Sequence, residues 1–273
     1  MCGLTGVLLY PTQRSPEEWA GIKEIAIANL TFNEVRGREA SGMTVIQQDG
    51  TCHLFKQPVP ATDLVTMDGF HEVMANVGPH TTCILGHTRA PTKGTRWNNA
   101  NNHPLHAGHV VGIHNGTIDN DDALFEELQI PRIGEVDSEI IFQLQNQIDP
   151  RYTNGRYAAE MQHRSRILDG SFATLSVDLR EPTSLLVLKH LRPLCVHYDE
   201  TWRALFFSSR YVFLRKSFGR SVITEALDSG YGYIFDARHL PTSGNQPLLS
   251  FEIEDISERN STPPTFTRVA YNR

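Results

Sequence analysis

MCGLTGVLLY, residues 1–10, places a cysteine directly before an apolar run. Residues 4–10 are typical of a buried strand, and such a strand could anchor the chain end so that Cys2 is held in place. Loss of Met1 would leave Cys2 with a free α-amino group, whose usual pKa of about 7.7–8.0 lets it accept a thiol proton. The alternative is that Cys2 is a small buried hydrophobic residue, the commonest role of a free cysteine.

The composition is that of a globular protein able to bury a core. Of the 273 residues, 40% are hydrophobic and 21% charged, which predicts one large α/β or α+β domain or two small ones. The net charge of -6 gives no indication of a basic surface that would bind nucleic acid. No apolar stretch is long enough to span a membrane. Four cysteines without a C-x-x-C pair argue against a disulfide framework and, with no signal-peptide pattern, predict a cytoplasmic protein.

Helices and strands are expected in clusters along the chain. Ser15, Pro16 and Glu18 form a helix-start signal, and Asp49–Gly50 marks a hairpin turn. The expected helices cover residues 16–30, 63–75, 120–128, 137–148 and 157–168, with a glycine-rich turn, RGREASG, at 36–42. The expected strands cover residues 4–10, 43–47, 53–56, 82–87, 109–114, 172–179, 184–189, 194–197, 204–208, 233–235 and 248–253. Such clusters favour an α+β fold over a doubly wound parallel sheet.

Two polar stretches follow expected strands and offer groups for chemistry. In LGHTRAPTKG, residues 85–94, Arg89 could clamp a carboxylate with its guanidinium, and the alternative is an ordinary surface arginine. In HNGTIDN, residues 114–120, the Asn115 amide and the Gly116 backbone N–H could form an oxyanion hole. The alternative for this Asn-Gly pair is the turn of a type I′ hairpin.

Asp137 and a group of histidines complete the candidate residues. In VDSEII, residues 136–141, Asp137 could cap a helix, hold a substrate ammonium group, or do both. Histidines at positions 103, 106, 109 and 114 suggest a metal, but their spacing matches no common zinc motif and no cysteine or carboxylate cluster joins them. No metal and no cofactor are therefore expected.

The ordered set of motifs resembles the class II glutamine amidotransferases, the N-terminal-nucleophile glutaminases, and above all the glutaminase domain of glucosamine-6-phosphate synthase. MCGLTGV is similar to MCGIxG, RGREASG to RGYDSAG, and GHTRAPTKG to GHTRWATHG. NNHPL is similar to NAHPH, HNGTIDN to HNGIIEN, and VDSEII to TDTEVI. The likeness covers about residues 2–210. Each motif is weak alone, whereas the order of all of them behind a terminal cysteine is specific.

The resemblance implies a role for each candidate residue. Cys2 would attack the side-chain amide of glutamine and form a γ-glutamyl thioester, with its own α-amine as general base and then acid. Asn115 and Gly116 would form the oxyanion hole. Arg89 would bind the α-carboxylate of glutamine, and Asp137 would bind its α-ammonium group.

The resemblance also implies supporting residues and a fold. Thr92 and His103 would line the glutamine pocket, and Arg36 would help to place the terminal amine. The expected fold is an α+β, four-layer αββα sandwich of the N-terminal-nucleophile hydrolase type, with two mostly antiparallel sheets. Residues 1–240 are expected to form the glutaminase domain, and residues 241–273 a C-terminal extension packed on it or extending from it.

This sequence departs from the family pattern in the loop that would cover glutamine. Ala90 stands where the sugar synthase has a tryptophan, and Lys93 where it has a histidine. Leu105 stands where a second histidine is expected. Trp97, further along the loop, is the candidate to take the place of the missing tryptophan.

Three functional hypotheses follow. The first is a stand-alone glutaminase that supplies ammonia to a separate acceptor enzyme, because 273 residues leave no room for an acceptor domain. The second is a hydrolase of γ-glutamyl amides or peptides that uses the same Cys2. The third is a non-catalytic regulatory module of the same fold. The sequence does not indicate the oligomeric state.

Overall fold

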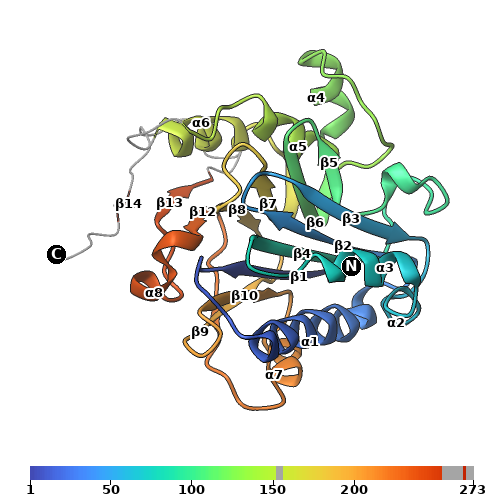
Figure 1. The fold of residues 1–273 in the computed structure, drawn as a ribbon. Coiled ribbons are helices and arrows are strands. Elements are labelled where there is room, and N and C mark those ends of the chain that lie inside the picture. Colours follow the sequence, from blue (N-terminus) through green and yellow to red (C-terminus); the bar gives the residue numbers. More distant parts are fainter. Residues whose placement is uncertain (152–155, 254–266, 269–273) are drawn as a thin grey trace.

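The computed structural model describes residues 1–151, 156–253 and 267–268, and their strands form two seven-stranded sheets (Figure 1). The first sheet has the order β11-β9-β10-β1-β4-β2-β3 and the second β14-β13-β12-β8-β7-β6-β5. All pairs of named strands in the described residues are antiparallel. The strands of the first sheet are β1 Gly3–Leu9, β2 Ala40–Gln47, β3 Cys52–Gln57, β4 Thr81–Arg89, β9 Cys195–Asp199, β10 Ala204–Ser208 and β11 Glu225–Ala226. Those of the second are β5 Leu105–Ala107, β6 Val110–Ile118, β7 Gly170–Asp178, β8 Ser184–His190, β12 Tyr231–Asp236, β13 Leu249–Glu252 and β14 Thr267–Arg268.

Helices cover the outer faces of both sheets, which confirms the predicted four-layer α+β sandwich. One set packs on the first sheet: α1 Pro16–Asn33, α2 Ala61–Leu64, α3 Asp68–Ala75 and α7 Tyr211–Phe218. The other set packs on the second sheet, at the opposite side of the molecule in Figure 1: α4 Asp121–Glu127, α5 Glu139–Asn146 and α6 Arg156–Ser165. The short helix α8, Leu240–Ser243, follows β12.

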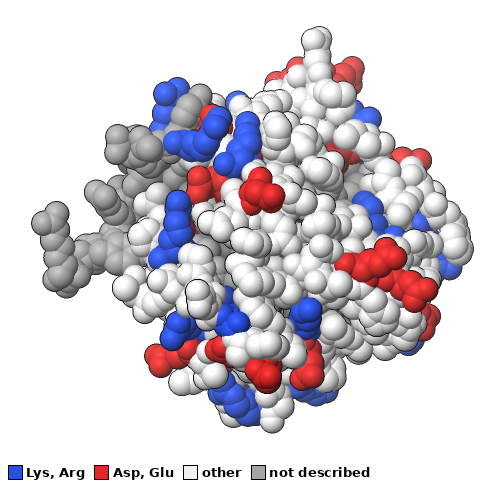
Figure 2. Space-filling view, in the orientation of Figure 1, with Lys and Arg blue, Asp and Glu red and all other residues white. Residues whose placement is uncertain are grey.

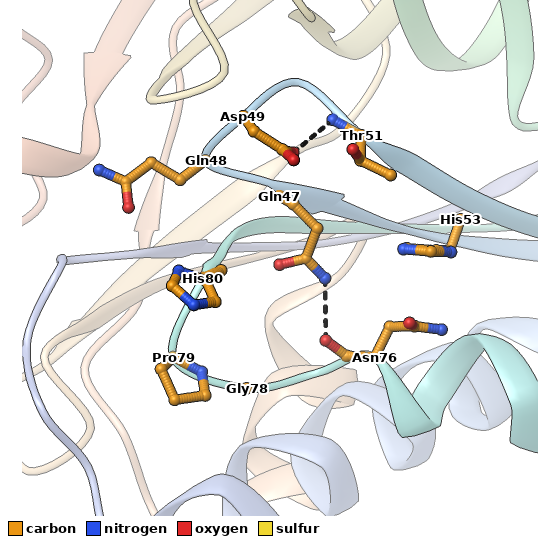
Figure 3. Close-up of a pocket in the computed structure, with 9 residues that line it drawn as sticks. All are labelled: Gln47, Gln48, Asp49, Thr51, His53, Asn76, Gly78, Pro79 and His80. Carbon is orange, nitrogen blue, oxygen red and sulfur yellow. Dashed lines mark hydrogen bonds between the residues drawn. The ribbon is translucent and has the colours of Figure 1, made fainter.

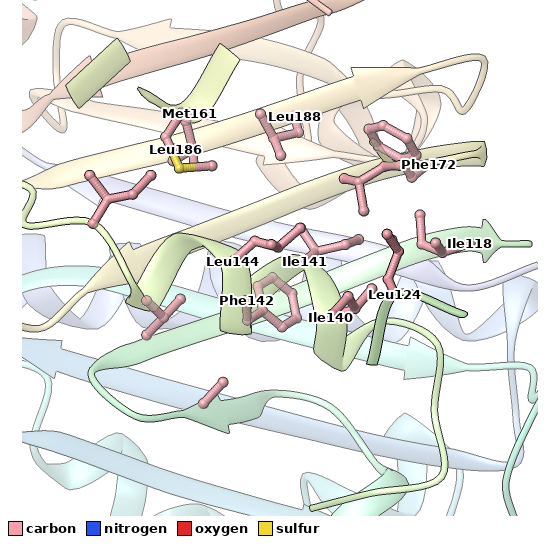
Figure 4. Packing of buried hydrophobic residues seen from close by; sticks show 14 of the residues in the cluster. Ile118, Leu124, Ile140, Ile141, Phe142, Leu144, Met161, Phe172, Leu186 and Leu188 are labelled. Atoms are coloured by element: carbon pink, nitrogen blue, oxygen red, sulfur yellow. The ribbon is translucent and has the colours of Figure 1, made fainter. Parts of the chain in front are cut away.

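Three buried apolar clusters fill the three interfaces between these layers. Figure 4 shows the one between α5, α6 and the second sheet, where Ile141 and Leu144 of α5 face the strands that carry Leu186 and Phe172. The strand β1 is buried on both faces, since Leu4 and Leu8 belong to the cluster between the sheets and Val7 and Leu9 to the cluster under α1. This position explains why residues 4–9 form a nearly continuous apolar run, although the sheet is antiparallel.

The helix α1 begins as its sequence predicts. The Glu18 backbone N–H donates to the Ser15 hydroxyl at 3.2 Å, and the Ser15 N–H donates to the Glu18 carboxylate at 2.7 Å. This capping box satisfies two N–H groups that the first turn leaves unpaired, and Pro16 follows at the first helical position. The hairpin of β2 and β3 around Gly50 also forms as predicted.

The structure departs from the local predictions at several points and excludes one alternative. The predicted turn at 36–42 ends early, since β2 already begins at Ala40. The Asn115–Gly116 pair is no hairpin turn but lies inside β6, opposite Ala173 and Phe172 of β7. The predicted helix 63–75 divides into α2 and α3, and α7 was not predicted.

The end of the chain belongs to the second sheet where it is described. The strand β13 pairs with β12, so residues 249–252 extend that sheet. The division into a domain of residues 1–240 and an extension of residues 241–273 stays a prediction, and residues 254–266 and 269–273 lie outside the described part. Within the described residues, no helix has the length and apolar character needed to cross a membrane. The face in Figure 2 carries charges of both signs, dispersed among uncharged residues.

Candidate active site

Cys2 is held immediately before the central strand of the first sheet. The strand β1 pairs with β4 on one side and β10 on the other, and Gly3 lies opposite Thr88. The Cys2 thiol lies 3.6 Å from the Ala90 carbonyl oxygen, and the Arg36 Nε–H donates to the Cys2 carbonyl at 2.8 Å. The chain end is therefore anchored on both sides of the thiol.

The thiol needs a base to react at neutral pH. Burial raises the pKa of Cys2 above its usual value, against the smaller lowering effects of its hydrogen bond to Ala90 and of Arg89. A thiol is a weak nucleophile compared with its thiolate. A reaction at the Cys2 sulfur would therefore require a base that removes the thiol proton.

A small cavity brings most of the predicted site residues together. Its walls include Cys2, Arg89, Thr92, His103, Gly116 and Asp137, together with Ala90, Pro91, Lys93, His114, Val136 and Ser138. Its volume is about 20 Å³, room for one or two water molecules. In this arrangement the cavity is smaller than a molecule of the size of glutamine.

Asn115 and Gly116 lie side by side in β6. The Asn115 side chain is fully buried, and neither its amide nitrogen nor its oxygen has a hydrogen-bond partner. Gly116 has φ of +143°, and a Cβ there would lie 1.9 Å from the Ser171 carbonyl oxygen. Only glycine fits this backbone, and an unpaired buried amide next to it is the kind of group that a site keeps for a ligand.

Asp137 does not cap a helix as predicted. The helix α5 begins at Glu139 with Ser138 before it, and no side chain caps its first turn. Asp137 instead accepts a hydrogen bond from the Ile118 backbone N–H at 2.7 Å. This bond crosses from the α4–α5 connection to the end of β6 and aims the buried carboxylate at the cavity.

Arg89 is nearly fully buried, which excludes the surface alternative. It donates to the Asn102 side-chain oxygen at 2.9 Å, to the Lys93 carbonyl at 2.7 Å and to the Gly94 carbonyl at 2.9 Å. A guanidinium carries five N–H groups, so two are left for another acceptor. Arg89 thus supports the loop and has two N–H groups left to donate.

The cover loop, residues 90–98, is tied to the second half of the molecule. The Lys93 ammonium pairs with Asp121 at 2.8 Å and with Asp122 at 2.7 Å, both at the start of α4. Thr92 is exposed, and Trp97 is 70% exposed under the stacked guanidinium of Arg96. Trp97 therefore does not replace the missing tryptophan over Cys2 in this arrangement.

Three buried histidines lie at the cavity: His103 and His114 line it, and His87 lies behind His103. His103 stacks on His87 with ring centroids 4.3 Å apart, and His114 shares a hydrogen bond of 2.8 Å with the Ser138 hydroxyl. Burial lowers the pKa of all three, to about 3 for His87, so they are neutral at pH 7. Among the described residues, no three or more His, Cys, Asp or Glu side chains are grouped to hold a metal ion.

These histidines predict a loss of stability in mild acid. The pKa of His87 is lower in the folded protein than the usual 6.5, so below pH 6.5 the unfolded chain binds a proton that the folded chain refuses. The free energy of unfolding is expected to fall as the pH drops from 6.5 towards 3, by about 1.4 kcal/mol per pH unit for each such histidine. Chemical denaturation at several pH values measures this slope.

A matched pair of variants separates His87 from general acid effects. His87→Gln should reduce the slope, and His71→Gln, which changes an exposed histidine of α3, is the control. Equal slopes for the wild-type protein and His87→Gln would contradict the assignment to His87.

Sequence reasoning missed the residues that support the site. Asn102 holds Arg89, Ser138 holds His114, and Asp121 holds Lys93. The sequence gives little indication of these residues, because each acts through a partner far away in the chain. The repeated Asn-Asn in NNANNHPL, which contains Asn102, was the one local signal.

A larger hollow of about 620 Å³ lies at the turn of β2 and β3, away from Cys2 (Figure 3). Its lining includes Gln47, Asp49 and His80, and none of the predicted site residues is part of it. The Gln47 amide donates to the Asn76 carbonyl at 2.8 Å, and Asp49 accepts from the Thr51 N–H at 2.8 Å. These groups hold the turn together.

Comparisons with known proteins show similarity to glutamine amidotransferases. A family model described as a glutamine amidotransferase domain matches residues 92–216. The chain is 28% identical over 216 residues to 7-cyano-7-deazaguanine synthase 2 of Sulfurisphaera tokodaii, covering 77% of this chain and 43% of that protein. It is 28% identical over 213 residues to the isomerizing glutamine–fructose-6-phosphate aminotransferase of Staphylococcus epidermidis, covering 75% of this chain and 32% of that protein. The chain thus spans less than half the length of these relatives.

Solved structures share the fold. The glutamine phosphoribosylpyrophosphate amidotransferase of B. subtilis superposes with a TM-score of 0.69 at 18% identity, over 93% of this chain and 49% of that one. A glutamine aminotransferase class-II domain protein of Silicibacter pomeroyi superposes with a TM-score of 0.52 at 15% identity, over 86% of this chain and 95% of that one.

Proposed function

Because the chain carries a class II glutamine amidotransferase domain, the N-terminal-nucleophile type, we propose that it releases ammonia from the side-chain amide of glutamine through Cys2. The observation that carries the proposal is the single cavity in which Cys2, Arg89, Gly116 and Asp137 meet. A thiol, a cation, an anion and an N–H donor are the groups that an α-amino acid amide needs for binding and cleavage.

The reaction begins at the thiol. Loss of Met1 gives Cys2 a free α-amine, which accepts the thiol proton as the sulfur attacks the amide carbon of glutamine. The carbonyl oxygen becomes an oxyanion, and the N–H donors of Asn115 and Gly116 stabilise it. The protonated amine then gives its proton to the leaving nitrogen, so that ammonia departs and a γ-glutamyl thioester forms. Water attacks the thioester, releases glutamate and restores the thiol.

The other end of glutamine is held by charge. The buried Asp137 carboxylate pairs with the α-ammonium group, and the two free N–H groups of Arg89 donate to the α-carboxylate. The cover loop opens to admit the substrate, since the closed cavity is too small for it. Thr92 and His103 complete the pocket wall.

Ammonia requires an acceptor, which we place on a separate enzyme. At neutral pH free ammonia is largely protonated and no longer nucleophilic, so an acceptor bound near Cys2 uses it best. Two relatives whose names describe syntheses beyond glutamine hydrolysis are more than twice as long as the matched region.

The proposal is tested by intact mass and by substrate choice. The mature protein should lack Met1 and should gain one adduct with an electrophilic glutamine analogue, and a retained Met1 would contradict the terminal-amine mechanism. Ammonia release from glutamine is then compared with cleavage of γ-glutamyl peptides. Faster cleavage of the peptides would show that the protein is a γ-glutamyl hydrolase and not a glutaminase. No turnover of either substrate would favour the hypothesis of a regulatory module.

Asp137→Asn should raise KM for glutamine by about 10- to 100-fold, the value of a hydrogen bond to a charged group, with a smaller change in kcat. The asparagine oxygen can still accept from the Ile118 N–H, so the fold is expected to persist. Steady-state kinetics with glutamine, and with an analogue that lacks the α-amine, measure the effect. Asp119→Asn, which changes an exposed neighbour, is the matched control. An equal loss with both substrates would show that Asp137 does not bind the ammonium group.

A further inference from the structure

Three arginines from distant parts of the chain gather beside Cys2. Arg36 ends the short 3-10 helix Glu34–Arg36, Arg192 follows β8, and Arg210 precedes α7. The Arg192 guanidinium lies 3.7 Å from the Met1 sulfur, and Arg36 and Arg210 line a pocket of about 490 Å³ together with Met1. Val35, Val212 and Phe213 form the rest of its lining. Arg192 is not part of the lining but lies at its edge through the contact with Met1, and we call this hollow together with Arg192 the arginine pocket.

Within the described residues, no carboxylate forms an ion pair with Arg36, Arg192 or Arg210. The Nη2 of Arg36 and the Nε of Arg192 are buried without a hydrogen-bond partner. Burial lowers the pKa of Arg36, and the charges of Arg210 and Arg192 lower it further. Buried N–H groups of a cation are costly to leave unpaired, so this arrangement calls for an anion.

The helix α7 adds to the positive potential. Its eight residues begin at the pocket, where Val212 and Phe213 of the first turn form part of the lining. No side chain caps this end, and the first turn contains no acidic residue. The unpaired N–H groups and the helix dipole favour a negative group at such an end.

The pocket adjoins the nucleophile on a different side from the amino-acid clamp. Arg89 and Asp137 line the cavity over the Cys2 thiol, whereas Met1 lines the arginine pocket. Loss of Met1 would bring the Cys2 α-amine to the edge of the arginine pocket, and in the proposed reaction that amine hands its proton to the leaving group.

We infer that the arginine pocket binds an anionic group, a carboxylate or a phosphate. This group belongs either to the leaving group of the substrate or to the molecule that receives the released ammonia. This inference rests on the proposed function for the role of the anion. Its two sources are a γ-glutamyl substrate whose leaving group carries an acid, and a separate acidic acceptor.

A binding experiment tests the pocket without turnover. The mature protein is titrated with inorganic phosphate by calorimetry, and the double variant Arg192→Gln, Arg210→Gln should bind phosphate at least about tenfold more weakly. Arg215→Gln removes an arginine of the same helix outside the pocket and should bind like the wild-type protein. The single variant Arg210→Gln, at an exposed position, replaces the double variant if that one does not fold. Absent binding, or equal binding by the wild-type protein and the pocket variant, would overturn the inference.

A kinetic experiment identifies the source of the anion. Values of kcat/KM are compared for γ-glutamylglycine and γ-glutamylglycinamide, whose leaving groups are similar in size but differ by one negative charge, and the pocket variants control for the different basicity of the two amines. If the wild-type protein prefers γ-glutamylglycine and the pocket variants lose this preference, the anion belongs to the leaving group. Equal values together with phosphate binding assign it to a separate acceptor. A protein inactive on these compounds and on glutamine contradicts the proposed function, and the phosphate titration still decides the pocket.

Discussion

Cys2→Ala is expected to lower kcat/KM for glutamine by at least about 10³-fold, because it removes the atom that forms the thioester. The fold should persist, since β1 is held by its pairing with β4 and β10 and the thiol makes one long hydrogen bond, to the Ala90 carbonyl, among the described residues. Ammonia release under steady-state conditions measures the loss. Intact mass should show that the variant no longer gains an adduct with an electrophilic glutamine analogue.

Cys52→Ala is the matched control for this experiment. Cys52 is also partly exposed, and its sulfur lies 3.0 Å from the Thr44 hydroxyl, far along the sheet from Cys2 in the strand order. This variant should keep both turnover and the adduct. If Cys2→Ala retained wild-type turnover, catalysis through Cys2 would be wrong.

Asn115→Ala is expected to lower kcat by about 10²- to 10³-fold with little change in KM, as the loss of one oxyanion donor does. Stability should hardly change. The Asn115 amide makes no hydrogen bond in the folded protein, so its removal leaves no other group unpaired, and the free energy of unfolding should stay within about 1 kcal/mol. Kinetics with glutamine and chemical denaturation of the same preparation measure the two effects.

Asn29→Ala shows what a structural asparagine does. The Asn29 amide donates to the Phe207 carbonyl at 2.9 Å, and its oxygen accepts from the Ser208 hydroxyl at 2.8 Å. Its loss should cost about 1–3 kcal/mol of stability, since it leaves buried groups unpaired. A similar loss of stability in Asn115→Ala, with kcat unchanged, would mean that Asn115 serves the fold and not the reaction.

The local part of the fold could be predicted from the sequence. The helix α1 follows from the capping box of Ser15 and Glu18 and from apolar residues at helical spacing, because these interactions join residues within one turn. The strand β1 follows from its apolar run. The four-layer sandwich followed from the resemblance, and composition and periodicity indicated no more than an α+β fold.

Much of the candidate site was not visible in the sequence, because its geometry depends on contacts between distant segments. Asn115–Gly116 has the local signature of a turn, yet pairing with Phe172 and Ala173 of β7 keeps it in a strand. Asp137 has the signature of a helix cap, yet its carboxylate binds the Ile118 N–H at the end of another element. In both cases the conformation depends on a partner that is distant in the sequence, β7 for Asn115–Gly116 and the Ile118 N–H for Asp137.

The sequence by itself determined which chemical groups are present: a cysteine before a buried strand, and an arginine, an Asn-Gly pair and an aspartate in ordered motifs. The tertiary structure decided which of them meet. Cys2, Arg89 and Asp137 share one cavity because β1 and β4 pair and because Asp137 is fastened to the end of β6. The arginine pocket was decided by tertiary structure alone, since Arg36, Arg192 and Arg210 lie far apart in the chain and no local pattern records which distant side chains will pack together.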